Sequence, residues 1–150
     1  MDKHPRRCLS LLLQHSSRGW QLMGAVPEPE HAEVGPVREL VRDAADARLV
    51  RWSGFPLQLH PDGCDDYWFN VTSRQPLLFV MCQPGDDGEP RPVRISADQE
   101  DGVAASEVEG IVFETPMAPP LVLWVRDYVA AYWQPGPRKN KRKPREEVGQ

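Results

Sequence analysis

The 150-residue sequence contains few cysteines and no hydrophobic run near the length that crosses a membrane. Its three cysteines, Cys8, Cys64 and Cys82, form no Cys-x-x-Cys pair. An odd and sparse set of cysteines fits a reducing compartment better than a disulfide framework. A spanning helix needs about 20 apolar residues, and the apolar run at 8–13 is too short even for a signal peptide. We therefore expect a cytoplasmic protein with no membrane contact.

The sequence also lacks the motifs of the common catalytic sites. It contains no Gly-x-Ser-x-Gly, no glycine-rich phosphate loop and no Gly-x-Gly-x-x-Gly. Nucleophilic catalysis needs a Ser or Cys beside a base and an oxyanion donor, and no such set stands out around the four histidines. We expect a protein that is not an enzyme and that holds no cofactor.

Charge is divided unevenly between the body of the chain and its C-terminus. Residues 138–150 carry two acidic residues and six basic ones: Arg138, Lys139, Lys141, Arg142, Lys143 and Arg145. The remaining residues include 12 basic and 20 acidic ones. Because an acidic body repels a phosphate backbone, we expect nucleic-acid contact only through this tail. Solubilising charge is the simpler interpretation of the tail.

Alternation of apolar and polar side chains predicts an antiparallel sheet. The expected strands are residues 8–15, 20–26, 48–55, 67–72, 77–82, 93–96 and 108–114. Residues 77–82 are apolar on both faces, which favours a central position in the sheet. His60-Pro61-Asp62-Gly63 is typical of a turn, since Pro presets φ and Gly permits a positive φ. Residues 97–107 are expected to form an irregular acidic link.

Helical patterns are rarer. Pro119-Pro120 opens one amphipathic helix, because Pro is tolerated in a first turn. Its wide apolar face should pack onto the sheet. Residues 28–47 are charged and poor in aromatics, with a short helical spacing at Val37, Leu40 and Val41. They are predicted to be a mobile or partly helical insertion.

These patterns predict one α+β domain over residues 8–135. The expected architecture is a twisted antiparallel sheet or partly open barrel of about six to seven strands, with one C-terminal amphipathic helix. A disordered N-terminus at 1–7 and a basic disordered tail at 136–150 would flank it.

One short segment carries side chains that are typical metal ligands. His60, Cys64 and Asp66 lie close together, and such groups can bind Zn²⁺. They fall on the predicted turn, however, where Asp commonly makes local hydrogen bonds, and no second ligand pair exists elsewhere to close a tetrahedral site. A solvated turn is favoured over a metal site.

The five tryptophans suggest a binding surface as well as a core. Trp124 and Trp133 belong to the predicted amphipathic helix, which leaves Trp20, Trp52 and Trp68. Exposed aromatic side chains are typical anchors of protein interfaces. These three residues are therefore the candidates for a partner-binding patch, and a protein partner is expected.

A wider pattern covers most of the chain, from about residue 8 to residue 145. Its parts are Gly19-Trp20, Leu57-x-Leu59-His60, Tyr67 and Asn70, Arg74-Gln75-Pro76, Met117 to Leu121, Trp124, Tyr128 and the basic end. In these motifs the chain resembles the bacterial DUF3305 family. It departs from the family at 28–47, which looks longer than usual, and at 98–106, where relatives tend to show a short acidic helix.

The resemblance implies a context rather than a chemistry. Members of the family are often encoded beside molybdenum-dependent formate dehydrogenases and their maturation proteins. This implies a non-catalytic accessory role in assembling or maturing a formate dehydrogenase or a related molybdoenzyme through protein–protein contact. Two alternatives remain: a nucleic-acid-associated regulator that uses the basic tail, and a small metal- or ligand-binding protein.

Overall fold

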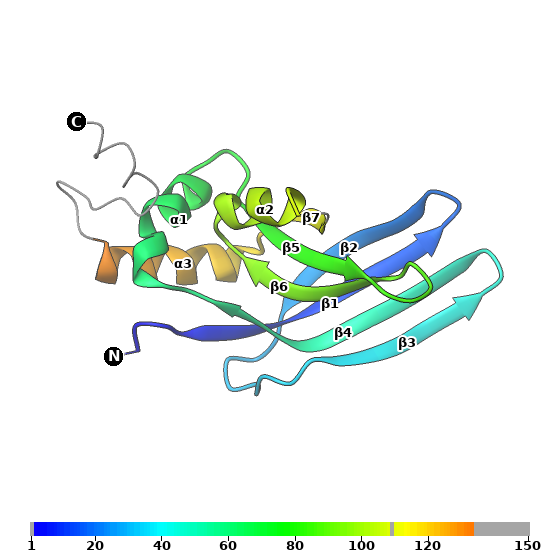
Figure 1. The fold of residues 1–150 in the computed structure, drawn as a ribbon. Helices are drawn as coiled ribbons and strands as arrows, with labels where there is room; N and C mark the ends of the chain where they lie inside the picture. Colours follow the sequence, from blue (N-terminus) through cyan, green and yellow to red (C-terminus); the bar gives the residue numbers. More distant parts are fainter. Residues whose placement is uncertain (1, 109, 134–150) are drawn as a thin grey trace.

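In a computed structural model that describes residues 2–108 and 110–133, seven strands form one mixed sheet (Figure 1). The strands are β1 (Arg6–Ser16), β2 (Gly19–Pro27), β3 (Val37–Ala44), β4 (Ala47–Gln58), β5 (Leu77–Pro84), β6 (Pro90–Ser96) and β7 (Ile111–Pro116). The helices are the 3₁₀ turn η1 (Pro61–Gly63), α1 (Cys64–Val71), α2 (Gln99–Ser106) and α3 (Pro119–Tyr132).

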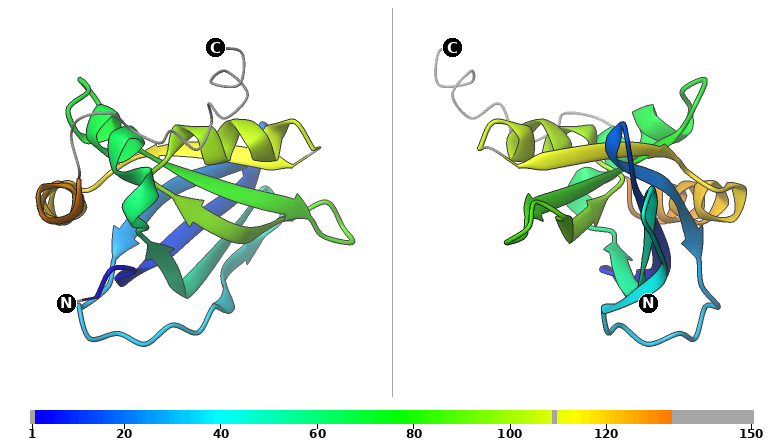
Figure 2. Two further views of the ribbon diagram at one scale, coloured as in Figure 1. Left: turned by 60° about the vertical axis from the view of Figure 1, so that its left-hand side comes forward. Right: turned by 90° about the vertical axis from the view of Figure 1, so that its right-hand side faces the viewer.

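The strand order is β2-β1-β4-β6-β5-β7, with β3 paired to β4 outside this path. β7 returns to lie beside β2, so the sheet almost closes into a barrel (Figure 2). Most neighbours are antiparallel, but β4 meets β6 in parallel at Leu57 and Ile95. The predicted α+β domain with a partly closed sheet is therefore confirmed, although the sheet is mixed rather than wholly antiparallel.

A bulge in β4 allows this strand to change partners along its length. Leu9 of β1 lies opposite Phe55 while Leu11 lies opposite Trp52, so β4 carries one extra residue there. Within the bulge, Gly54 has a φ of 69°, a conformation that favours glycine. Before the bulge β4 pairs with β3, and after it β4 pairs with β6.

The core fills the space inside the curved sheet. Leu9, Leu11, Leu57, Leu78 and Val80 are wholly buried there. Each large apolar side chain moved out of water stabilises the fold by about 1.5–3 kcal/mol. The alternating strands predicted at 8–15, 20–26 and 48–55 appear as β1, β2 and β4, and the central strand predicted at 77–82 appears as β5, with neighbours on both sides.

Three expectations about secondary structure are wrong. Residues 67–72, predicted as a strand, belong mostly to α1, which spans Cys64–Val71, because Cys64, Tyr67 and Val71 recur at helical spacing and are the buried residues. Residues 99–106, predicted as an irregular link, form α2. The side chain of Asp98 caps this helix by accepting a hydrogen bond from the Glu100 amide at 2.9 Å.

The third correction concerns residues 28–47. Val37–Ala44 form strand β3, not the partial helix that the spacing of its apolar residues suggested. Cross-strand pairing with β4 overrides that local spacing. The boundary at residue 8 also shifts, since β1 begins at Arg6 and the carbonyl of Lys3 accepts a 2.6 Å hydrogen bond from the hydroxyl of Tyr128.

The helix predicted after Pro119-Pro120 is confirmed as α3. It buries Leu121, Val125, Tyr128 and Val129, and it packs against α1. At its C-terminal end the indole Nε1 of Trp133 donates a 2.8 Å hydrogen bond to Asp65. None of the helices in the described part of the chain is long and apolar enough to span a membrane.

Candidate functional site

α1 turns one face to the core and presents aromatic side chains on another. Its buried side is made by Cys64, Tyr67 and Val71. Phe69 leaves 74% of its surface exposed and Trp68 leaves 40%. Single exposed apolar residues are ordinary, but Phe69 is exposed to 74% beside a groove that it lines, which makes it a candidate contact residue.

The segment before α1 fixes the start of the helix. The hydroxyl of Tyr67 accepts a 3.0 Å hydrogen bond from the backbone amide of His60. The Tyr67 ring lies so close to Gly63 that a Cβ there would be 2.6 Å from it, so a side chain at this position would displace the ring. Burial raises the pKa of Tyr67 well above its usual value, so the hydroxyl stays protonated even in alkaline solution.

A side-chain amide joins α1 to the sheet. Asn70 Nδ2 donates to the carbonyl of Leu77 at 2.7 Å and to that of Ala97 at 2.9 Å. Its Oδ1 accepts a hydrogen bond from the Leu77 amide at 2.9 Å. Asn70 therefore holds the first residue of β5 and the residue after β6 against the helix. Asn70 also begins the triplet Asn70-Val71-Thr72, which matches the N-glycosylation sequence pattern, and these hydrogen bonds give the asparagine a structural role.

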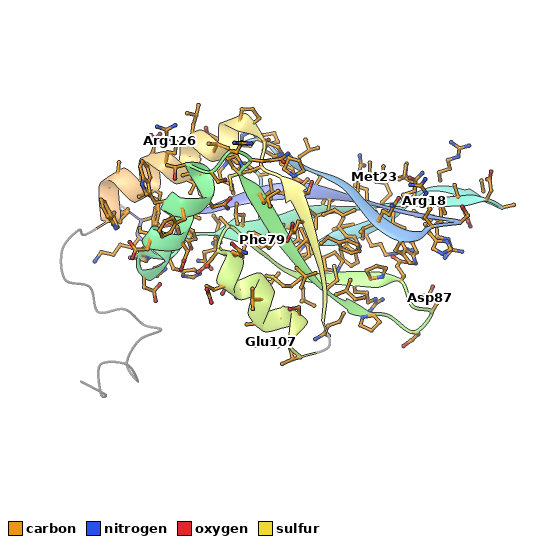
Figure 3. The ribbon with its side chains drawn as sticks, turned by 90° about the horizontal axis from the view of Figure 1, so that it is seen from above. Arg18, Met23, Phe79, Asp87, Glu107 and Arg126 are labelled. Atoms are coloured by element: carbon orange, nitrogen blue, oxygen red, sulfur yellow. The ribbon has the colours of Figure 1, made fainter. Side chains whose placement is uncertain are left out.

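An open groove of about 520 Å³ lies beside this helix. α1, the loop after it, β5, α2 and β7 contribute its lining: Asp66, Phe69, Asn70, Ser73, Arg74, Gln75, Leu77, Phe79, Gln99, Glu100 and Glu114. A smaller hollow of about 170 Å³ shares Phe79, Gln99 and Glu114 and extends the groove along α2. Figure 3 shows Phe79 beside α2.

The groove combines an apolar floor with an acidic rim. Phe79 is almost fully buried at 4% exposure and supports Gly102 of α2, whose Cβ position is 3.4 Å from the ring. Three carboxylates line the groove, from Asp66, Glu100 and Glu114, against the single cation of Arg74. Such a lining favours an apolar ligand that also carries positive charge.

The three candidate metal ligands do not converge. Cys64 is buried in the core, whereas Asp66 lines the groove. His60 Nδ1 is 3.1 Å from Nδ1 of His4, and burial, followed by the proximity of His4, lowers the pKa of His60. Across residues 2–108 and 110–133, no three His, Cys, Asp or Glu side chains are grouped so that they could hold a metal ion.

The three candidate tryptophans lie on different elements and form no common patch. Trp20 stacks beside His15, with ring centroids 5.0 Å apart, at the end of the β1–β2 hairpin. Trp52 packs against the core and Phe55, and its Nε1 is buried without a hydrogen-bond partner in the described part of the chain. Of the three, Trp68 alone lies on α1, at the opposite end of the molecule from that hairpin tip (Figure 1).

The basic residues from Arg138 to Arg145 lie outside the described residues. Phe69 falls within the strand predicted at 67–72, and the alternation there gives no sign that it is exposed on a helix. The acidic pair Asp65 and Asp66 could have indicated a helix start here, since carboxylates are favoured near a helix N-terminus.

These features define a small α+β protein whose sheet almost closes and whose helices α1 and α2 border an acidic, partly aromatic groove. The chain belongs to the DUF3305 family, whose model matches residues 13–143 and whose description is a protein of unknown function. No curated protein and no solved structure matches the chain.

Proposed function

We propose that this protein is a non-catalytic accessory protein that docks a segment of a partner protein in the groove between α1 and α2. The observation that carries the proposal is the exposure of Phe69, which leaves 74% of its surface in solvent at the groove. Aromatic side chains at the centre of an interface commonly supply most of its binding energy.

The neighbouring residues support a fixed rather than an adaptable site. Asn70 holds the helix to β5 and β6 through three hydrogen bonds. Phe69 is thus presented by a helix that the very next residue fixes to the sheet. A preformed site avoids part of the entropy that ordering a loop would cost on binding.

The charge of the groove indicates the chemistry of the occupant. With carboxylates from Asp66, Glu100 and Glu114 and one guanidinium from Arg74, the groove is complementary to a partner segment with apolar and basic side chains. Family resemblance suggests the partner: a subunit of a molybdenum-dependent formate dehydrogenase or a related molybdoenzyme, bound during its assembly or maturation.

The experiment measures recovery of the catalytic subunit of the host's formate dehydrogenase on the immobilised full-length chain. We expect Phe69→Ala to reduce recovery by about 30-fold, the effect of losing an interface anchor. Leu123→Ala is the matched control, because Leu123 is 61% exposed on α3 and does not line the groove. Equal recovery by the original chain and Phe69→Ala, or no recovery by either, would refute the proposal.

A further inference from the structure

β3 is an edge strand with one unused side. It pairs with β4, and in the described part of the chain no other strand pairs with it. Seven of its eight residues are exposed, including Val37, Leu40 and Val41 at 58%, 44% and 46%. Such an edge presents unpaired backbone groups to which another strand can add.

A bulge changes which side chains of β3 share a face. Leu40 lies opposite Val50 and Arg42 lies opposite Leu49, so Val41 is an extra residue. In a regular strand, residues separated by an odd number lie on opposite faces. The extra residue reverses this relation across the bulge. Arg38 and Asp43 therefore share one face, and Glu39 and Arg42 share the other.

Contacts within the chain agree with this assignment of faces. Arg38 forms a two-pronged ion pair with Glu89, with both N–O distances at 2.9 Å. Arg48 lies 3.5 Å from Asp43, its cross-strand neighbour, and 3.9 Å from Asp87. The loop between β5 and β6 thus lies on the side of the sheet to which Arg38 and Asp43 point, although both residues stay exposed. Glu39 pairs with Arg51, its cross-strand neighbour, on the other face.

The order of charges on β3 is complementary to itself when the strand is reversed. We propose that the free edge of β3 pairs antiparallel with β3 of a second copy of this chain, with Arg38 opposite Asp43 and Glu39 opposite Arg42 of that copy. Leu40 then lies opposite Val41, and Val37 opposite Ala44. Opposite charges that face each other across strands stabilise the pairing.

A second copy fits this edge because the pairing is isologous. One two-fold axis between Leu40 and Val41 repeats every contact, so each opposite-charge pair occurs twice. The bulge is needed for this symmetry, since without it the paired charges would point to opposite faces of the joined sheet. Arg42 forms no hydrogen bond or ion pair with the rest of the described chain, so a second copy would supply its partner.

The first test is a charge swap followed by sedimentation of the full-length protein. We expect the original chain to approach twice the 17.0 kDa mass of one chain as its concentration rises. Arg42→Glu places Glu39 opposite a carboxylate twice, and should weaken association at least tenfold. The triple variant Glu39→Arg, Arg42→Glu and Arg51→Glu restores opposite charges between the copies and keeps an ion pair between residues 39 and 51, and should recover the association. A chain that stays monomeric up to about 1 mM, or a triple variant as weak as Arg42→Glu, overturns the proposal.

The second test locates the symmetry axis with single cysteines. In the proposed pairing the two copies of residue 41 lie about 6 Å apart, within disulfide reach, while the two copies of residue 37 lie about 23 Å apart. Val41→Cys should therefore form a disulfide dimer on mild oxidation, and Val37→Cys should not. The native cysteines do not interfere, because all three are buried. Equal cross-linking of the two variants, or none of Val41→Cys, contradicts the proposal.

Discussion

The side-chain amide of Asn70 pairs with the backbone of Leu77 as a neighbouring strand would. It donates to the Leu77 carbonyl at 2.7 Å and accepts from the Leu77 amide at 2.9 Å. A third hydrogen bond reaches the carbonyl of Ala97. One polar residue thereby connects the helix that carries Phe69 with the beginning of one strand and the end of another.

Replacing Asn70 should show how strongly the fold depends on this connection. Asn70→Ala leaves two backbone carbonyls and one amide without their partner, and an unsatisfied buried polar group costs about 1–3 kcal/mol. We expect a loss of about 2–4 kcal/mol in the free energy of unfolding, measured by urea denaturation. Ser73→Ala is the control, since the Ser73 hydroxyl donates to the exposed Asn70 carbonyl, and it should change stability by less than about 0.5 kcal/mol. Similar values for the two variants would contradict this role.

The bulge in β4 gives a second prediction. At Gly54 a Cβ would face two obstacles, a φ of 69° and a clash with the carbonyl oxygen of Gly35. Gly88 has a φ of 86° but nothing within 4 Å of its Cβ position. Gly88→Ala should therefore cost about 1–2 kcal/mol for conformation alone, and Gly54→Ala about 3–5 kcal/mol. Both are measured as shifts in the denaturation midpoint, and equal costs would show that the backbone contact is unimportant.

Glu28 helps to explain why the bulge forms where it does. Its Oε2 accepts hydrogen bonds from the hydroxyl of Ser10 at 2.7 Å and from the amide of Gly54 at 2.9 Å. The carboxylate thus satisfies a backbone amide that the bulge removes from the regular strand ladder. A segment predicted as a mobile insertion begins with a residue that has a defined structural role.

The pH dependence of stability should report on His60. Burial, and then the proximity of His4, lower its pKa below the ordinary value of 6.5. The unfolded chain therefore binds a proton more readily than the folded chain. The stability that comes from keeping the His60 imidazole neutral is fully present above about pH 7.5. It is lost as the pH drops through 6.5 toward the folded-state pKa.

The measurement compares the original chain with His60→Gln from about pH 8 to pH 5. Unfolding of the original chain takes up to about one proton at His60, which adds a slope of up to about 1.4 kcal/mol per pH unit to its free energy of unfolding. The variant should lack this slope. His4 loses its neighbour in this variant, since its Nδ1 lies 3.1 Å from that of His60, so the difference between the two curves reports the contribution of the His4–His60 contact. Parallel curves would show that the imidazole titrates equally in the folded and unfolded chains.

Much of the sheet could be predicted because its strands have one buried and one exposed face. Leu9, Leu11 and Leu13 of β1 are all wholly buried, and their alternation is plain in the sequence. β3 gives no such signal, because seven of its eight residues are exposed and neither face is apolar. Its existence depends on hydrogen bonding to β4, which is a tertiary interaction.

The candidate site was harder to predict because local patterns at α1 conflict. Tyr67, Phe69 and Val71 alternate as a strand would, while Cys64, Tyr67 and Val71 fit a helix. The structure buries the second set, which leaves Phe69 in solvent. The groove itself joins α1, α2, β5 and β7, and such a juxtaposition depends on the tertiary fold rather than on any local pattern.

The distance between β3 and the helices has a consequence for stoichiometry. Figure 1 places β3 on the opposite side of the sheet from α1 and α2, so occupation of one surface leaves the other accessible. Two chains joined edge to edge through β3 would offer two grooves, each on the part of its chain far from the joined edges. A partner that is itself dimeric could then engage both grooves at once, and its avidity would exceed the affinity of a single groove.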